Sequence, residues 1–302
     1  MRIGIDLGGT KTEIVALDAF TGRELYRRRV PTECTYDGVI RGVRDLVANA
    51  EQELQRTATV GVGIPGSLSS STGLIRNANS TWINGHPLDR DLSSALQREV
   101  RLENDANCFA VSEAHDGAGA RAAIVFGVIL GTGTGAGVVI NGKCVKGANG
   151  IAGEWGHNPL PWPKVLENGK DERPGRACYC GRSGCIETWL SGPGFETDYR
   201  EAAGERRPSE GIVALAAAGD TAARLVLARY VDRLARSLAH VINILDPDVI
   251  VLGGGMGKIS SLYDEVPRRW GQYIFSDSVR TALRPPVHGD SSGVRGAAWL
   301  WP

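Results

Sequence analysis

The sequence predicts an α/β protein with two domains. Residues 3–17 read as a strand, a tight glycine turn and a second strand, and the same arrangement returns at 126–140. Two such units, one in each half of the chain, indicate an internal duplication in which each copy opens its own α/β domain. The 302 residues suffice for two cores of about 150 residues each.

Apolar periodicity and turn residues place the elements of the first half. They are, in order, a helix over 37–56, an apolar strand over 60–64, a turn-rich stretch over 67–87, a helix over 89–98, a strand over 100–102 and a helix over 106–116. The strand over 60–64 ends at Pro65-Gly66, and the strand over 100–102 delivers Glu103, Asn104 and Asp105 at its end.

In the second half, Asn141-Gly142 signals a hairpin toward residues 143–145. The remaining predicted elements are a proline- and glycine-bearing loop over 158–177, helices within 186–203 and 210–245, a buried strand over 249–252 and a last helix over 293–301. We expect the last helix to pack back on the first domain. The predicted domains are therefore 1–117 together with about 288–302, and a larger one over 118–287.

Composition excludes several classes of partner. Charged residues make up 23% of the chain and balance to a net charge of zero, so nothing favours nucleic acid or an anionic membrane surface. The first six residues read as a strand and not as a signal peptide, and no run of about 18 apolar residues indicates a membrane span. Six cysteines without a secretory signal suggest a reducing compartment. We expect a cytoplasmic protein.

The glycine turn after the first strand has the chemistry of a phosphate loop. Gly8, Gly9 and Thr10 can turn backbone N–H groups toward one point, and Lys11 can neutralise charge. Asp6 stands where it can hold magnesium through water. A plain hairpin with a glycine turn is an equal alternative when the loop is taken alone.

Two further glycine runs extend the same interpretation. Residues 131–135, Gly-Thr-Gly-Thr-Gly, match a dinucleotide pattern, but a strand follows where that motif requires a helix, so we reject a Rossmann site. No Walker-type P-loop run is present. Residues 253–255, three glycines between a strand and a helix, can receive a ribose or an α-phosphate. Each run is ambiguous, but together they favour a triphosphate site.

Three cysteines and a histidine predict a zinc site. Cys178, Cys180 and Cys185 place three soft ligands within eight residues, and His157 is the nearest histidine upstream. Four protein ligands leave no open position, which favours a structural ion. The alternative is three reduced thiols on a flexible loop, a redox liability. The other cysteines, Cys34, Cys108 and Cys144, are isolated, and we expect them to be ordinary buried or surface residues.

The order and spacing of these motifs resemble the ROK family of repressors and sugar kinases, within the actin-like ATPase superfamily. The resemblance runs nearly end to end and is closest to the family's bacterial fructokinases (manno-/fructokinases). It rests on residues 6–11 (DLGGTK), 63–66 (GIPG), 103–107 (ENDAN), 131–133 (GTG), 153–157 (GEWGH), 178–187 (CYCGRSGCIE) and 252–255 (LGGG). It implies two RNase H-like domains with a cleft between them.

The resemblance also implies roles for individual residues. Asp105, whose default interpretation is a helix N-cap, becomes the general base. Sugar hydroxyls would be bound by Gly66, Asn79, Asn104, Asp105, Glu154, His157 and Glu187, of which Asn79 is a weaker candidate. Zinc would be held by His157, Cys178, Cys180 and Cys185. ATP would contact Gly4, Ile5, Asp6, Leu7, Gly8, Gly9, Thr10, Lys11, Gly131, Thr132, Gly133, Thr134, Gly135, Ala136, Gly137, Val138, Val139, Ile140, Gly253, Gly254 and Gly255.

The predicted activity is ATP- and Mg²⁺-dependent phosphorylation of a free hexose at its 6-hydroxyl. The segment 77–85 and the Gly-Glu-Trp run at 153–155 favour fructose, with mannose as a further substrate. The alternatives are an N-acetylglucosamine or glucose kinase of the same family and, more distantly, a non-catalytic sugar sensor or a repressor. A repressor needs a helix-turn-helix before the first phosphate loop, which here begins at Asp6. The family's habit of forming dimers favours a homodimer.

Overall fold

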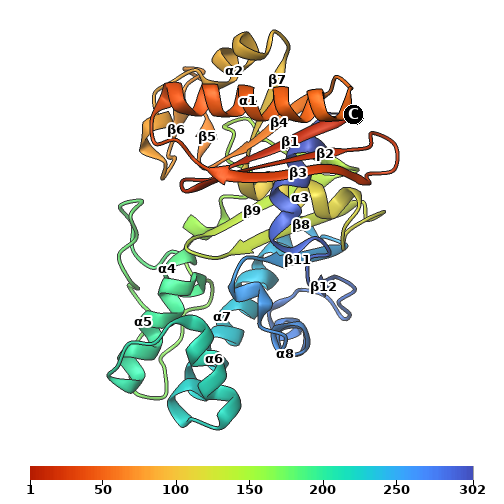
Figure 1. Cartoon of the computed structure of the whole chain (residues 1–302). Helices are drawn as coiled ribbons and strands as arrows, with labels where there is room; N and C mark the ends of the chain where they lie inside the picture. Colours follow the sequence, from red (N-terminus) through yellow and green to blue (C-terminus); the bar gives the residue numbers. More distant parts are fainter. Residues whose placement is uncertain (302) are drawn as a thin grey trace. The chain divides into compact units, whose positions relative to one another are not determined.

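The computed structural model describes residues 1–301, with Asp290 described by its backbone alone. The chain forms two compact units (Figure 1). Unit 1 comprises Met1–Ala122, Gly137–Ala152 and the segment from Pro286 onward, and unit 2 comprises Ala123–Ala136 and Gly153–Pro285. The chain contains two five-stranded sheets with helices packed around them. The predicted α/β class is confirmed.

The sheet of unit 1 has the strand order β3-β2-β1-β4-β7. Its strands are β1 (Arg2–Leu7), β2 (Lys11–Leu17), β3 (Glu24–Pro31), β4 (Thr59–Ile64) and β7 (Val100–Asn104). The first three form an antiparallel meander, and β4 and β7 run parallel to β1. Strand β3 was not predicted, because its charged and largely exposed residues are those of a sheet edge that resists pairing with another chain.

Helices cover both faces of this sheet (Figure 1). On one face lie α1 (Tyr36–Leu54) and α2 (Leu88–Leu96), whose apolar residues share one core with Ile3 and Ile5. On the other lie α3 (Asp105–His115) and α9 (Ser292–Ala298). Helix α9 packs closely because Gly4 and Gly61 are paired neighbours beneath it: a Cβ at Gly4 would lie 2.0 Å from the carbonyl oxygen of Val294.

Short elements fill the rest of unit 1. They are the ribbon β5 (Ser67–Leu68) and β6 (Ile75–Arg76), the 3₁₀ turns η1 (Thr81–Ile83) and η5 (Gly289–Ser291), and the strand β10 (Lys143–Cys144). The domain prediction assigned all of 118–287 to the second domain, whereas Gly137–Ala152 groups with unit 1. The physical reason lies at Gly137, where an absent side chain lets the strand touch α3: a Cβ there would lie 2.8 Å from the carbonyl oxygen of Ala106.

The second sheet repeats the strand order of the first. Its order is β10-β9-β8-β11-β12, formed by β8 (Ile124–Leu130), β9 (Thr134–Ile140), β10, β11 (Val249–Gly253) and β12 (Ala282–Arg284). Strands β8, β11 and β12 are parallel, and β9 and β10 form the hairpin predicted at Asn141-Gly142. The division between the two units falls within β9. In each sheet a three-stranded meander precedes two further strands, which agrees with the predicted duplication.

Unit 2 carries most of the helices. They are η2 (Trp155–His157), α4 (Glu187–Leu190), α5 (Gly192–Ala203), α6 (Ser209–Ala218), α7 (Thr221–Leu245), η3 (Met256–Lys258), α8 (Leu262–Trp270) and η4 (Gly271–Tyr273). Helix α7 buries Arg233 and Arg236, each 1% exposed, against Glu172 of the predicted loop over 158–177. Buried, hydrogen-bonded ion pairs therefore anchor a loop that has few apolar residues.

Among the described residues, no single helix is long and apolar enough to cross a bilayer. Helices α6 and α7 would meet the length and composition test only when taken together, across a bend of 114°.

Candidate active site and metal centre

The first glycine loop is the turn between β1 and β2. Gly8 donates its N–H to the carbonyl oxygen of Lys11, at 3.0 Å, which closes the turn. Thr32, just after β3, braces the loop: its N–H donates to Thr10 O at 3.0 Å and its hydroxyl donates to Gly8 O at 2.8 Å. Thr10 and Lys11 are exposed. The side chains of Thr10 and Lys11 thus face solvent, while Thr32 holds the backbone of the loop in place.

Two carboxylates of unit 1 influence each other electrostatically. Asp105 is the first residue of α3, and its Oδ1 accepts from the N–H of Ala106 at 2.8 Å. Burial raises the pKa of Asp6 to about 6, and the negative charges of Asp105 and Glu13 add to this shift while the Arg29 guanidinium opposes it. A pair of carboxylates that repel each other is suited to sharing a divalent cation.

One chain of hydrogen bonds connects three predicted sugar-site residues. The side-chain Nδ2 of Asn104 donates to Gly66 O at 2.8 Å, and its Oδ1 accepts from Ala106 N at 2.9 Å as the N-cap of α3. Gly66 adopts a φ of +75°, and a Cβ there would lie 2.4 Å from Arg76 O. Asn104, Gly66 and Asp105 are therefore brought together. Asn79 is exposed in the neighbouring loop.

Sequence reasoning missed two residues that organise this region. Glu103 Oε1 accepts from Asn104 N at 3.0 Å and from Asn107 Nδ2 at 2.9 Å, which joins the end of β7 to the first turn of α3. Asn84 clamps Ala78 with a pair of hydrogen bonds of 3.0 and 2.9 Å. Both residues lie inside motifs, since Glu103 directly precedes Asn104 and Asn84 directly precedes a glycine. Their position in these motifs was the feature of the sequence that could have identified them.

The second glycine loop lies between β8 and β9 in unit 2. Gly131 N donates to Gly133 O at 2.9 Å within the loop, and Gly192 N donates to Gly131 O at 2.8 Å from outside it. At the other end, Thr134 N donates to Glu187 Oε2 at 2.9 Å. Glu187, predicted as a sugar ligand, thus contacts the second glycine loop in this structure.

The third glycine run lies beside the second loop. Strands β8 and β11 are parallel neighbours, with Gly253 paired to Ile129, so both loops leave the same edge of the sheet. Gly254 has a φ of +78°, and a Cβ there would lie 2.4 Å from Leu130 O. Only glycine allows this approach, which brings the two runs together.

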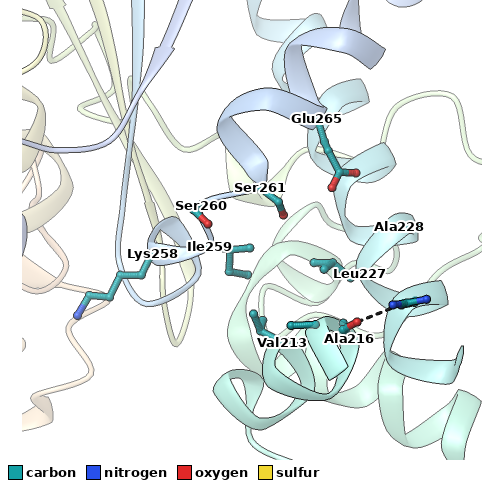
Figure 2. A pocket seen from close by; sticks show the side chains of 11 residues that line it. Val213, Ala216, Leu227, Ala228, Lys258, Ile259, Ser260, Ser261 and Glu265 are labelled. Atoms are coloured by element: carbon teal, nitrogen blue, oxygen red, sulfur yellow. Dashed lines mark hydrogen bonds between the residues drawn. The ribbon is translucent and has the colours of Figure 1, made fainter. Parts of the chain in front are cut away.

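A pocket of ≈ 440 Å³ opens next to the third glycine run (Figure 2). Lys258, at the end of η3, lines the pocket and donates its N–H to Gly255 O at 3.3 Å. The walls come from α6, α7 and α8 and combine aliphatic side chains with a polar rim. The lining residues are Val213, Ala216, Ala217, Arg224, Leu227, Ala228, Lys258, Ile259, Ser260, Ser261 and Glu265. Arg224 is fixed at the rim by donation to Ala216 O at 3.1 Å.

The predicted metal ligands meet at one point. One donor atom from each of His157, Cys178, Cys180 and Cys185 lies within 4.8 Å of the other three. The Sγ atoms of Cys180 and Cys185 are 3.6 Å apart, and His157 Nδ1 is 3.6 Å from Cys178 Sγ. Zinc–sulfur bonds of about 2.3 Å in a tetrahedron require sulfur separations of about 3.8 Å. The donors and their spacing fit a structural zinc site.

The ring of His157 is held in the orientation that such a site needs. Its Nδ1 faces Cys178, and its Nε2 lies 3.0 Å from the hydroxyl of Tyr179. A partner on the second ring nitrogen fixes the tautomer of a metal-binding histidine. Tyr179, which the sequence analysis did not single out, is 82% exposed. Glu154, three residues before His157, is exposed as well.

Several residues expected to contact ATP lie inside the sheets instead. Gly4 is covered by α9, and Ile5 is fully buried in the core that includes α1. Ala136 and Val139 are buried along β9, and Gly137 packs on α3. The predicted contact set extends beyond the turns into strands whose side chains fill the core, and it stays a prediction. The turn residues 8–11 and 131–134 and the glycine run 253–255 remain the candidates.

The chain matches the ROK family model over residues 2–302. It is 41% identical over 302 residues to an N-acetyl-D-glucosamine kinase of Escherichia coli O157:H7, with 99% of each chain covered. A similar kinase of Shigella boydii is also 41% identical over 302 residues, again with 99% of each chain covered. These relatives do not support the predicted fructokinase and favour the N-acetylglucosamine alternative.

Solved structures agree with the two-sheet architecture. A ROK hexokinase from Thermus thermophilus is 30% identical with a TM-score of 0.86, over 99% of this chain and 96% of that one. A ROK family glucokinase from Streptomyces griseus, in complex with glucose and AMPPNP, is 26% identical with a TM-score of 0.76, over 99% and 98% of the two chains. The match to the family model and the similarity of these relatives together establish that the chain belongs to the ROK family, as a sugar kinase.

Proposed function

We propose that this protein transfers the γ-phosphoryl group of ATP to the 6-hydroxyl of N-acetylglucosamine. The observation that carries the proposal is the Asp105 carboxylate at the start of α3, joined to Asn104 and Gly66 through one set of hydrogen bonds. The choice of sugar is supported by relatives that are 41% identical over nearly their whole length. Fructose, favoured by short motifs, has no comparable support, because selection among hexoses depends on pocket geometry that such motifs do not encode.

The proposed chemistry requires one base and an in-line displacement. Asp105 accepts the proton of the 6-hydroxyl while that oxygen attacks the γ-phosphorus. The bond from the γ-phosphorus to the bridging oxygen breaks, and ADP leaves with that oxygen. The products are the sugar 6-phosphate and ADP, and the transferred proton is released from Asp105 to solvent. Asn104 and Gly66 hold the base at the end of β7.

The nucleotide is assigned to the glycine loops. Backbone N–H groups near Gly9 and Thr10 are suited to phosphate oxygens, and so is the turn 131–134. The third glycine run and the adjoining pocket of ≈ 440 Å³ suit the nucleoside end. Aliphatic walls such as Val213, Leu227 and Ile259 are surfaces on which a planar base can lie. The related glucokinase, solved in complex with glucose and AMPPNP, supports the binding of a nucleoside triphosphate.

Two metal ions complete the proposal. Magnesium, which neutralises charge on the phosphates when it is bound, would be held by Asp6, whose carboxyl lies in the field of Asp105. Zinc would be held by His157, Cys178, Cys180 and Cys185. With four protein donors it would have no open position, so its contribution is to structure alone.

The test is a coupled assay of the purified protein with MgATP against N-acetylglucosamine, glucose, mannose and fructose. We expect kcat/KM for N-acetylglucosamine to exceed that for fructose by about 100-fold or more, because an unfilled acetamide subsite leaves polar groups unpaired. Asp105→Asn serves as the control for contaminating kinases. A higher kcat/KM for fructose would overturn the choice of sugar, and ADP release with none of these sugars would overturn the activity.

A further inference from the structure

The second glycine loop is held at both ends by one short segment. At its start, Gly131 O accepts from Gly192 N at 2.8 Å, and at its end, Thr134 N donates to Glu187 Oε2 at 2.9 Å. Both partners belong to residues 187–192, the helix α4 and the first residue of α5. The loop's own contribution is a single turn bond from Gly131 N to Gly133 O. Its position therefore depends on this outside segment.

The same segment continues directly from the metal ligands. We define the metal knuckle as residues 155–157 and 178–187, which contain all four candidate ligands. Cys185 is two residues before Glu187, and its neighbour Ile186 is fixed by donation of its N–H to Asn158 O at 2.9 Å. Glu187 thus follows a candidate ligand by two residues and is next to a residue that a backbone hydrogen bond holds in place.

The first segment of the metal knuckle, residues 155–157, contacts the same loop residue, Thr134. Gly156, next to His157, packs so closely on Thr134 that a Cβ would lie 2.1 Å from Thr134 O. Glu187 accepts a hydrogen bond from the N–H of Thr134, and Gly156 packs against the carbonyl oxygen of Thr134. Thr134 is therefore clamped between the two chain segments that the four ligands bring together. Gly133 must lack a side chain as well, because its Cβ would lie 2.8 Å from Glu187 Oε2.

We propose that Glu187 is a positioning residue for the second phosphate loop and that, through it, the metal knuckle sets nucleotide affinity independently of the sugar. The role needs a hydrogen-bond acceptor at position 187 and does not need a negative charge. The inference rests on the proposed function in taking the loop 131–134 as a nucleotide site. It extends that function because a residue that only bound sugar would leave nucleotide binding in the absence of sugar unchanged.

The test compares Glu187→Ala with Glu187→Gln in titrations of MgADP by calorimetry, without sugar. The alanine removes the acceptor, so the loop is no longer held before binding, and we expect Kd to rise by about tenfold or more. The glutamine keeps an amide oxygen within reach of Thr134 N, and Kd should stay within about threefold of the wild type. Glu154→Ala, which removes an exposed carboxylate of the same region, should leave the nucleotide Kd unchanged.

Two further measurements separate positioning from misfolding. Hydrogen exchange of the unliganded protein should show faster exchange of the Thr134 amide in Glu187→Ala and near wild-type exchange in Glu187→Gln. Metal content of both variants should remain that of the wild type, because the four ligands are intact.

The proposal is overturned if Glu187→Ala binds MgADP as the wild type does. It is also overturned if Glu187→Gln binds it more tightly, since that would mean the carboxylate repels the phosphates or occupies their place. The two proposals fail differently. The proposed function fails on the sugar assay of the wild-type protein, whereas this role fails on nucleotide binding and Thr134 exchange measured without sugar.

Discussion

The two glycine loops are similar in sequence position but differ in what supports them. Each is the turn of an antiparallel hairpin that opens a five-stranded sheet. The first is braced by Thr32, which follows the third strand of the same meander. The second is braced by Glu187, Gly192 and Gly156, which come from helical segments far along the chain. One loop is completed by its own sheet, and the other needs a separate module.

This difference has a physical consequence for stability. Strands of a meander pair locally, so the support of the first loop forms with the sheet at small loop-closure cost. The support of the second loop requires three cysteines and a histidine to converge, which brings together thiolates that favour being apart unless a cation neutralises them. We therefore expect the two loops to respond differently to the same perturbation.

The largest expected effect leaves both loops intact. Asp105→Asn keeps an acceptor for the Ala106 N–H but removes the base, and we expect kcat to fall by about 10²–10⁴-fold. Affinity for MgADP and the metal content should be unchanged, as measured by calorimetry and by metal analysis. Turnover near that of the wild type would exclude Asp105 as the base.

The next effect separates the loops. Cys180→Ser should release the metal and lower the free energy of unfolding by about 4 kcal/mol. Hydrogen exchange should increase in residues 131–134 and remain unchanged in residues 8–11. Cys144→Ser, a matched change at a cysteine of unit 1 outside the cluster, should retain the metal. Equal exchange changes in both loops would contradict the separation.

A pH-dependent effect belongs to the strand that precedes the first loop. Burial raises the pKa of Asp6 to about 6, so the folded state binds this proton more tightly than the unfolded chain. The resulting contribution to stability is present below pH 4 and is lost as pH rises toward 6. At pH 7.5, Asp6→Asn should therefore stabilise the protein, by on the order of 2 kcal/mol.

Urea unfolding of wild type and Asp6→Asn at pH 4 and pH 7.5 measures this contribution. The gain from the substitution should appear at pH 7.5 and shrink at pH 4. A variant that is less stable than the wild type at pH 7.5 would show that the folded protein stabilises the ionised carboxylate of Asp6, and it would contradict this prediction. Catalysis should still be lost in this variant if Asp6 holds magnesium.

The smallest effect tests the brace of the first loop. Thr32→Val preserves shape but removes the hydroxyl that donates to Gly8 O and lies 2.8 Å from the Thr12 hydroxyl. We expect a loss of about 1 kcal/mol in the free energy of unfolding and faster exchange in residues 8–11. Residues 131–134 serve as the internal control. Unchanged exchange in the first loop would mean that its own turn bond suffices.

Features that depend on neighbouring residues could be predicted from the sequence. The ligand set His157, Cys178, Cys180 and Cys185 was recognisable because three thiols within one short loop have few ways to avoid one another. Asp105 was placed at a strand-to-helix junction because the strand and helix patterns meet there. The hairpin at Asn141-Gly142 followed from the turn residues alone. Each of these features was indicated by residues that lie within a few positions of one another in the sequence.

Features that depend on distant contacts could not be predicted. Gly4 was taken for a nucleotide contact, but it is small because α9 crosses over it. The exposed, arginine-rich β3 lacks the apolar pattern by which a strand is recognised. Glu172 gives no sign in the sequence of the two arginines of α7 that neutralise it. In each case the deciding partner is far along the chain.

The sequence by itself therefore determined the fold class, the candidate base and the candidate metal ligands of this ROK sugar kinase. The fold class and the candidate metal ligands follow from covalent spacing, backbone preference and the chemistry of single side chains, whereas the role of Asp105 follows from the family resemblance. The tertiary structure alone decided that Glu187 holds Thr134, that Gly254 rests on Leu130 and that the two loops have unlike supports. The physical reason is that such contacts arise from packing between remote segments, whose distances and angles no local pattern specifies.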